Sequence, residues 1–395
     1  MPGAAGSRPE QPSLATRVTG SVPPEPGRVG PGMTVARSGG RRCLEGAVVS
    51  PAPREQWSAV LAADPAASVF QSPAWFDAAA AVTGARDASR LYETNDGRRL
   101  VLPLLRHRTL PGVALEAGHP HPFGPGGLLA AGGLRPDDVR LVLSDLAGSP
   151  AVSTRITALY DVAERWEAGL PPRATATRLP VHVLDLEGGF DRVWGERFHA
   201  SARKAVRRAE RAGLTVDRDT TGRLVPALYD LYLAWTTERA QRTGLPVPVA
   251  TALARRRQPL PMFEALATAP GLEGRTWLAS YQGEPVAALM TFVHGAHGIS
   301  FRSYGLREHG ALHASHLLKR LAIEDACVSG CRWFSLGMSG GAPGLVAFKE
   351  SLGAMPRWSL ECRVERLPLS RLERVRQRAE SSAVSAITRL RGRGA

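Results

Sequence analysis

The chain has 395 residues, enough for two domains of ordinary size, and its 44% hydrophobic and 22% charged residues are typical of a globular protein with a buried core. Its 50 Lys and Arg against 36 Asp and Glu give a net charge of +14, which favours an anionic partner such as RNA, a phosphorylated substrate, CoA or a membrane surface. An Arg-rich composition throughout the chain explains the same excess equally well.

Other compositional features exclude several classes of protein. Four cysteines in a chain of this length do not make a disulfide framework, which fits a reducing compartment. We find no run of 18 apolar residues and no apolar segment at the N-terminus, so we expect neither a membrane span nor a secretion signal. These observations predict a cytoplasmic protein.

Four segments are predicted along the chain. Residues 1–45 are rich in Pro, Gly, Ser and Arg without periodicity, which predicts disorder, and Met33 could be the true start. A first domain is expected over residues 46–186 and a second over 187–368. An Arg-rich tail follows at 369–395.

The first domain is predicted to be a small α+β unit. Helices are expected at 54–63 and 74–82, the second with Ser72 as its cap and Pro73 in its first turn. The turn Asn95-Asp96-Gly97 predicts a hairpin between strands 89–93 and 99–105. The remaining elements are a Gly/Pro/His-rich loop at 111–127, a helix at 136–146, and strands at 153–159 and 174–185.

The second domain repeats this order of elements. Its predicted helices are 190–212, ending at Gly213, and 224–243, 314–328 and 345–352. Its predicted strands are 276–281, 285–293, 299–304, 331–336 and 357–365. The expected fold class is therefore α/β (α+β), with a mixed sheet flanked by helices in each domain.

A basic helix is the first candidate site. Arg203 and Arg207 are four residues apart and point the same way, and Arg208 forms a neighbouring row with Lys204. Stacked like charges destabilise an isolated helix slightly, so an anionic partner would account for them. A solvated basic face is the alternative.

The second candidate site is a glycine-rich loop over residues 337–344, between a strand and a short helix that contains Phe348 and Lys349. Glycines allow a ligand to approach the backbone, and ligands of α/β proteins gather at the carboxyl ends of strands. The loop is neither a P-loop nor a dinucleotide fingerprint. An ordinary tight connection with a surface lysine is the alternative.

Two other kinds of site are not expected. His313 and His316 are three residues apart and Cys327 and Cys331 are four apart, but neither pair has the partners that a zinc site needs, so we predict no metal. The Gly-x-Ser-x-Gly motif of serine hydrolases is missing.

Several short motifs follow one another along the chain: Phe70-Gln71-Ser72-Pro73, the basic helix ending at Gly213, Phe334-Ser335-Leu336-Gly337, and Phe348-Lys349 followed by Leu352-Gly353. In this order they resemble the FemABX peptidyltransferases and related acetyltransferase (GNAT) proteins. The resemblance spans roughly residues 50–368 and implies tandem GNAT-like domains with a groove between them.

The resemblance also implies an activity and its residues. It implies transfer of an aminoacyl group from aminoacyl-tRNA to an amine, usually on a peptidoglycan precursor. Lys349, with Phe348, would act on the reacting carbonyl, and Arg203, Arg207 and Arg208 would meet substrate phosphate. We also place Tyr304 and Ser339 among the substrate-binding residues.

The chemistry of such a reaction needs no covalent nucleophile. An aminoacyl ester is already activated, so amine attack requires positioning, loss of one proton and stabilisation of an oxyanion. Lys349 could supply the positive charge, whereas the base is open between Glu350, His316 and a substrate phosphate. No cofactor is expected beyond the aminoacyl-tRNA co-substrate.

Two other functions stay open. One is an N-acyltransferase that uses an acyl-CoA, although residues 307–312 only loosely resemble the usual acetyl-CoA loop. The other is a non-catalytic RNA-binding module. The acceptor could be a phosphorylated cell-wall precursor, reached by peripheral contact with a membrane, or a small amine in a natural-product pathway such as antibiotic biosynthesis.

Overall fold

The computed structural model describes residues 48–110, 113–120, 122–171, 174–367 and 369. The predicted disordered segment 1–45, including Met33, lies outside these residues, as does the tail 369–395 apart from Leu369. All statements about the structure below concern the described residues.

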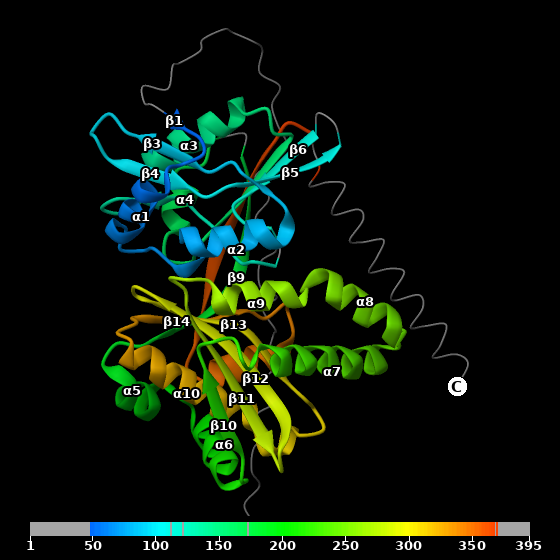
Figure 1. The fold of residues 1–395 in the computed structure, drawn as a ribbon. Helices are drawn as coiled ribbons and strands as arrows, with labels where there is room; N and C mark the ends of the chain where they lie inside the picture. The colour runs from blue at the N-terminus through cyan, green and yellow to red at the C-terminus, as the bar shows by residue number, and fades with distance from the viewer. Residues whose placement is uncertain (1–47, 111–112, 121, 172–173, 368, 370–395) are drawn as a thin grey trace, which may run out of the picture. The chain divides into compact units, whose positions relative to one another are not determined.

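A mixed sheet of eleven strands, flanked by helices, is the main feature of the fold (Figure 1). Its strands follow the order β10-β11-β12-β13-β14-β9-β15-β8-β6-β5-β2. Their bounds are β2 (Arg86–Asp87), β5 (Leu105–Leu110), β6 (Val113–Ala117), β8 (Ser153–Ala158), β9 (Thr175–Asp185), β10 (Thr215–Asp219), β11 (Glu273–Tyr281), β12 (Glu284–His294), β13 (His297–Gly305), β14 (Trp333–Met338) and β15 (Met355–Glu365).

A second sheet has four short strands in the order β1-β3-β4-β7. They are β1 (Val48–Val49), β3 (Arg90–Glu93), β4 (Arg99–Leu102) and β7 (Leu129–Ala130). Mixed sheets flanked by helices confirm the predicted α/β fold class.

The part of the chain that the structure describes contains eleven α-helices, which flank the sheets. They are α1 (Arg54–Ala63), α2 (Pro73–Thr83), α3 (Pro136–Gly148), α4 (Ala163–Ala168), α5 (Gly189–Arg192), α6 (Ala200–Arg211), α7 (Val225–Thr243), α8 (Val247–Arg257), α9 (Leu260–Thr268), α10 (Ala314–Val328) and α11 (Pro343–Ser351). None of the described helices is both long enough and apolar enough to cross a membrane.

Two helices confirm their sequence signals closely. The Ser72 hydroxyl accepts the backbone N–H of Trp75 at 3.2 Å, and Pro73 opens α2 as predicted. Helix α10 has the predicted bounds, 314–328, because its Leu317, Leu318, Ala322, Ile323 and Ala326 form one buried face.

The predicted single helix 190–212 is wrong. The chain forms α5, continues as a π-helical turn over Val193–Arg197, and becomes extended at Phe198 before α6 begins at Ala200. Phe198 is buried in the core beside Trp194, and the backbone N–H of His199 donates to the carbonyl of Ser351 at 2.9 Å. Tertiary packing and this hydrogen bond compensate for the break.

Other regions also differ from expectation. The predicted strand 99–105 splits into β4 and β5 around Pro103, which cannot donate to a strand ladder. The predicted loop 111–127 contains β6, which pairs with β5 and β8. Helices α8 and α9 were not predicted; each has a proline in its first turn.

The two halves of the chain share strands in the centre of the large sheet. Strand β9, at the end of the first half, pairs with β14 and β15 of the second half. Strand β15, the last strand of the described residues, also pairs with β8 of the first half. Within this continuous sheet, the division into domains at residue 186 stays a prediction.

The parallel strands β13 and β14 pair over only three residues. His297–Ile299 lies opposite Trp333–Ser335, and no further register pair joins these strands although they continue to Gly305 and Met338. The sheet therefore opens between their carboxyl ends, where ligand sites of α/β proteins occur. We call this opening the strand gap.

Candidate functional site

Lys349 lies buried at the strand gap, with 4% of its surface exposed. It projects from α11, and its ammonium Nζ donates hydrogen bonds at 2.8 Å to the carbonyl oxygens of Gly337 and Met338 on β14. Burial lowers the pKa of Lys349 to about 8. An ammonium has three protons, so one donor remains after these two bonds.

Ser339 lies beside Lys349 in the predicted glycine-rich loop. Its hydroxyl is 3.2 Å from Nδ1 of His182, a buried residue of β9. Burial, together with the positive charge of Lys349, lowers the pKa of His182, which also lies 4.0 Å from a carboxylate oxygen of Glu350. The loop thus brings a hydroxyl, an imidazole, a carboxylate and an ammonium to one end of β14.

A second buried lysine reaches the strand gap from α10. Lys319 is also 4% exposed, and its Nζ donates to the hydroxyl of Ser300 on β13. Burial, and next the charge of Lys349, lower the pKa of Lys319 to about 7. Each diverging strand therefore has a buried lysine against it.

A pocket of about 250 Å³ lies at the N-terminal end of α10. It is lined by Val286, Ala287, Gly305, Leu306, Arg307, His309, Gly310, His313, Ala314, Ser315, His316 and Phe348. Phe348 is thus part of the pocket wall, while its neighbour Lys349 points into the protein. The first backbone N–H groups of a helix attract anions, so this pocket suits a phosphate or carboxylate.

The histidines of this pocket stack against its aromatic wall. The ring of His316 meets the ring of Phe348 edge to face at 4.7 Å, and the His313 ring lies 5.6 Å from that of His316. Burial, and next His313, lower the pKa of His316 to about 4. His316 is therefore neutral at pH 7 and can accept a proton only weakly.

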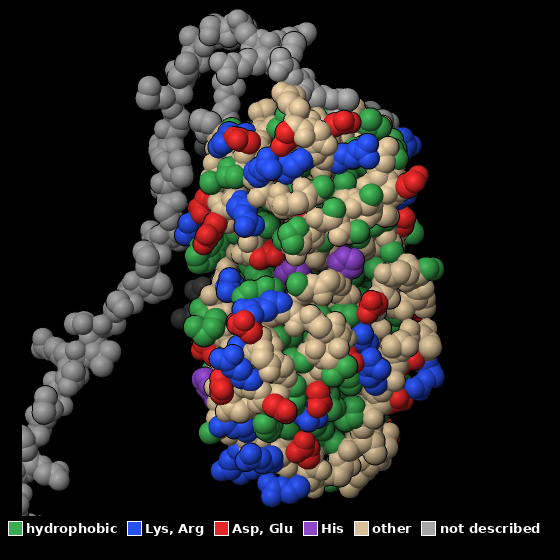
Figure 2. Space-filling view, turned by 90° about the vertical axis from the view of Figure 1, so that its left-hand side faces the viewer, with side chains coloured by type: hydrophobic (Ala, Val, Ile, Leu, Met, Phe, Trp, Pro, Cys, Tyr) green, Lys and Arg blue, Asp and Glu red, His purple; other side chains and the backbone are tan. Residues whose placement is uncertain are grey.

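The basic helix α6 divides into two roles. The Arg203 guanidinium donates to the carbonyls of Trp194, Gly195 and Phe198, and so holds the π-helical turn. Arg207 and Arg208 are exposed, and neither side chain forms an ion pair among the described residues. Figure 2 shows Lys and Arg side chains gathered at the lower end of its face, at the level of α6 in Figure 1.

Tyr304 lies on β13 and packs against α7. It is buried against α7, its ring 4.9 Å from that of Tyr232, and its hydroxyl donates to Gln258 at 2.9 Å. The same Gln258 oxygen accepts a bond from the half-buried Arg302 at 2.7 Å. The substrate-binding role of Tyr304 stays a prediction.

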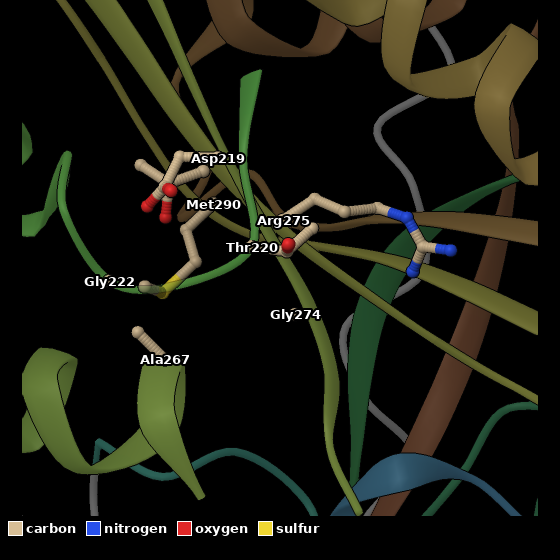
Figure 3. A pocket seen from close by; sticks show the side chains of 8 residues that line it. Asp219, Thr220, Gly222, Ala267, Gly274, Arg275 and Met290 are labelled. Atoms are coloured by element: carbon tan, nitrogen blue, oxygen red, sulfur yellow. The ribbon is translucent and has the colours of Figure 1, made fainter.

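A further hollow lies between β10, β11 and α9 (Figure 3). Asp219, Ala267 and Met290 line it, and it leaves no room for a water molecule. The Asp219 carboxylate accepts bonds from Thr221 and from the backbone N–H of Leu224 at the start of α7, so it holds this turn. Among the described residues, no group of three His, Cys, Asp or Glu could hold a metal ion.

Sequence reasoning found Phe348, Lys349 and Ser339 but missed Lys319, His182 and Ser300. His182 lies between the apolar residues Val181 and Val183 of a strand. A polar side chain in such a buried position indicates a functional or hydrogen-bonding role. Lys319 and Ser300 carry no local signal, because only tertiary packing brings α10 to β13.

Comparison with known proteins supports this architecture. The family model described as an acetyltransferase (GNAT) domain matches residues 196–350. The solved structure of FemX has a TM-score of 0.57 at 12% identity, covering 80% of this chain and 96% of FemX.

Two other solved structures are similar at lower scores. L-PGS from Bacillus licheniformis has a TM-score of 0.46 at 13% identity, covering 81% of this chain and 96% of that chain. A tandem GNAT protein from the clavulanic acid biosynthesis pathway has a TM-score of 0.40 at 15% identity. The match covers 80% of this chain and 98% of that chain. No curated protein sequence matches the chain significantly.

Proposed function

We propose that this chain, in which residues 196–350 form an acetyltransferase (GNAT) domain on the fold of FemX, moves an aminoacyl group from aminoacyl-tRNA to an amine acceptor. The GNAT domain identifies an acyltransferase in general terms. The tRNA donor and the amine of a phosphorylated cell-wall precursor or natural-product intermediate are our proposal.

The observation that carries the proposal is the pair Phe348–Lys349. Phe348 lines the pocket, and Lys349 lies buried at the strand gap with one donor left for a reacting carbonyl oxygen. Positive charge held in a dry interior stabilises an oxyanion more than the same charge in water. An ester donor and an amine nucleophile need this and correct positioning, without a covalent intermediate.

The basic surface of α6 supports a tRNA donor. Arg207, Arg208, Lys204 and Arg211 are exposed on this helix and form no ion pair with a carboxylate among the described residues. The backbone N–H of His199 bonds to Ser351, so the start of α6 adjoins the end of the helix that carries Lys349. A phosphate backbone bound along α6 would therefore run close to the site.

An acyl-CoA donor is the second candidate, and the pocket favours it. The N-terminal turn of the 15-residue helix α10 and Arg307 line this pocket, a suitable environment for a pyrophosphate. A pocket of this size accepts part of such a donor rather than all of it.

A transfer assay separates the two donors. The full chain is mixed with an acceptor pool and either charged tRNAs or acyl-CoAs, and amide product is followed by mass. Thermal shift with each donor supplies an independent readout, because a ligand at 100 times its Kd stabilises the fold by about 2.7 kcal/mol.

Three results are distinguishable. Amide formation from charged tRNA supports the proposal. Amide formation from acyl-CoA but not from charged tRNA would identify acyl-CoA as the donor in place of aminoacyl-tRNA. RNA binding without any transfer would identify a binding module.

A further inference from the structure

Lysine is exceptionally rare in this chain. Of its 50 basic residues, 47 are arginines, and the three lysines are Lys204, Lys319 and Lys349. Two of these three are buried at the strand gap. Arginine stays protonated in proteins, whereas a buried lysine can lose its proton near neutral pH, so lysine chemistry gives a reason for lysine at these positions.

The two buried lysines have no carboxylate partner. None of the ion pairs among the described residues includes Lys319 or Lys349, and the carboxylates of α10 bind elsewhere: Glu324 pairs with Arg320 and Asp325 with Arg275. The charged group that acts on Lys319 is Lys349, while His182 of β9 and Glu350 of α11 lie near Lys349. An uncompensated buried charge is unfavourable, and two are more so.

We propose that Lys319 is the residue that takes up the proton of the acceptor amine, acting through the hydroxyl of Ser300. Ser300 is partly exposed on β13, at the strand gap, and its hydroxyl bonds to Lys319 Nζ. The inference rests on the proposed function, in which an amine attacks an activated carbonyl.

The division of charge between the lysines supports this role. Burial and the charge of Lys349 bring the pKa of Lys319 to about 7, whereas burial brings that of Lys349 to about 8. The charge of Lys349 favours loss of the proton from Lys319 first, so Lys319 is the lysine that accepts a proton while Lys349 keeps its positive charge. One fold thus places a base and an electrostatic stabiliser side by side, with different protonation states.

The proton balance closes with these groups. Attack of the amine nitrogen on the ester carbonyl forms the C–N bond, and the surplus proton of the nitrogen passes through the Ser300 hydroxyl to Lys319. The C–O bond to the tRNA ribose then breaks, and its oxygen takes up the proton that Lys319 returns. In transfer from an acyl-CoA, the thiolate takes the same proton.

The first measurement is a titration that does not depend on transfer. Full-length protein labelled with ¹³C at lysine Cε should give three lysine resonances, assigned by Lys204→Met, Lys319→Met and Lys349→Met. We expect the Lys319 resonance to titrate near pH 7. Its midpoint should rise in Lys349→Met, because the neighbouring charge is gone. A midpoint near 10, the ordinary lysine value, would overturn the proposal.

The second measurement is the single-turnover transfer rate against pH. In the wild type, the rate should fall as pH drops through about 7, because Lys319 becomes protonated. Lys319→Met should lose this acid limb and about 10²-fold or more in rate at pH 7.5, and Lys319→Arg should not restore it. Ser300→Ala should lower the rate although Lys319 is present; Ser303→Ala, an exposed serine on the same strand, is its matched control.

The outcomes separate the two proposals. An active Lys319→Met or Ser300→Ala with a wild-type rate and acid limb overturns the role of Lys319 and leaves the function intact. A wild type that transfers nothing from either donor overturns the proposed function, and the role of Lys319 in transfer with it. If Lys319→Met does not fold, Ser300→Ala and the wild-type titration still decide.

Discussion

Lys349 should matter for the reaction far more than for substrate affinity. Its interaction with the carbonyl oxygen strengthens only as negative charge forms, so Lys349→Met should lower the single-turnover rate by about 10²–10³-fold and change donor binding little. Lys349→Arg should not fully restore the rate, because a planar guanidinium places its charge differently. A wild-type rate in Lys349→Met, with a folded protein confirmed by its Tm, would contradict this role.

Lys319 makes a prediction about stability. Its folded pKa, about 7, is below the unfolded value of about 10.4, so the unfolded chain binds more protons between these pH values. The free energy of unfolding should therefore rise as pH increases from 7 to 10, by on the order of 4 kcal/mol for this group.

The variant Lys319→Met tests whether Lys319 causes this rise in the free energy of unfolding with pH. The variant should lose this part of the pH dependence and melt above the wild type below pH 7, measured by thermal unfolding across pH 6 to 10. Lys204→Met is the matched control, because Lys204 is exposed. The same pH slope in wild type and Lys319→Met would show that Lys319 is charged in the folded protein.

Among single residues, the sequence predicts those that belong to a local motif and misses those that only the tertiary fold brings together. Phe348, Lys349 and Ser339 follow a glycine-rich loop after a strand, a local pattern that a single sequence contains. Arg203 has the same local pattern as Arg207, yet it is bound to three backbone carbonyls. Nothing in the spacing distinguishes them, because the π-helical turn that Arg203 holds arises from packing.

Two arginines of α6 should differ in what their substitution changes: Arg203 should affect stability, and Arg207 should affect tRNA binding. Arg203→Ala should lower the Tm, because the carbonyls of Trp194, Gly195 and Phe198 lose a charged donor, and a hydrogen bond to a charged group contributes about 1.5–3 kcal/mol. Arg207→Ala should leave the Tm within error, since exposed substitutions change stability by about 0.5 kcal/mol or less. It should weaken tRNA binding and reduce its salt dependence, measured as the slope of log K against log salt. Equal tRNA affinity in wild type and Arg207→Ala would exclude α6 as the phosphate-binding element.

A side chain added at Gly305, where β13 ends near the start of α10, should obstruct the pocket. A Cβ at Gly305 would lie 2.6 Å from the hydroxyl oxygen of Ser315, so Gly305→Ala must displace the Ser315 side chain, which lines the pocket. Donor binding should weaken, measured as a smaller thermal shift with charged tRNA or acyl-CoA. Gly148→Ala, where a Cβ meets nothing within 4 Å, is the matched control. Unchanged shifts in Gly305→Ala would place donor binding outside this pocket.

The elements predicted best are those whose signals lie within the element. Helix α10 has a complete apolar face, and α2 has a serine cap followed by proline, so both were found. The segment 190–212 has helical periodicity throughout, and only the packing of Phe198 and the bond from His199 to Ser351 break it. Strand β6 is short and depends on pairing with β8, which no local pattern encodes.

For the whole molecule, the sequence order of elements predicts the α/β class but not the shared sheet. The two halves look alike as separate units, and their strands give no sign that β9 and β15 cross between them. Removing residues 355–395 should therefore destabilise both halves, because β15 pairs with β8 and β9 together. Limited proteolysis of this truncation should cut within the first half as well as the second. Protection of the first half equal to that of the full chain would contradict this expectation.

The position of β15 also has a consequence for synthesis on the ribosome. Its partners β8 and β9 emerge roughly 200 and 170 residues earlier than β15. At a translation rate of about 5–20 residues per second they wait for about ten seconds or longer. During this time each has an unpaired edge, which is prone to pair with another chain. The nascent protein should therefore depend on a chaperone that shields strand edges until the last strand is released and inserts between them.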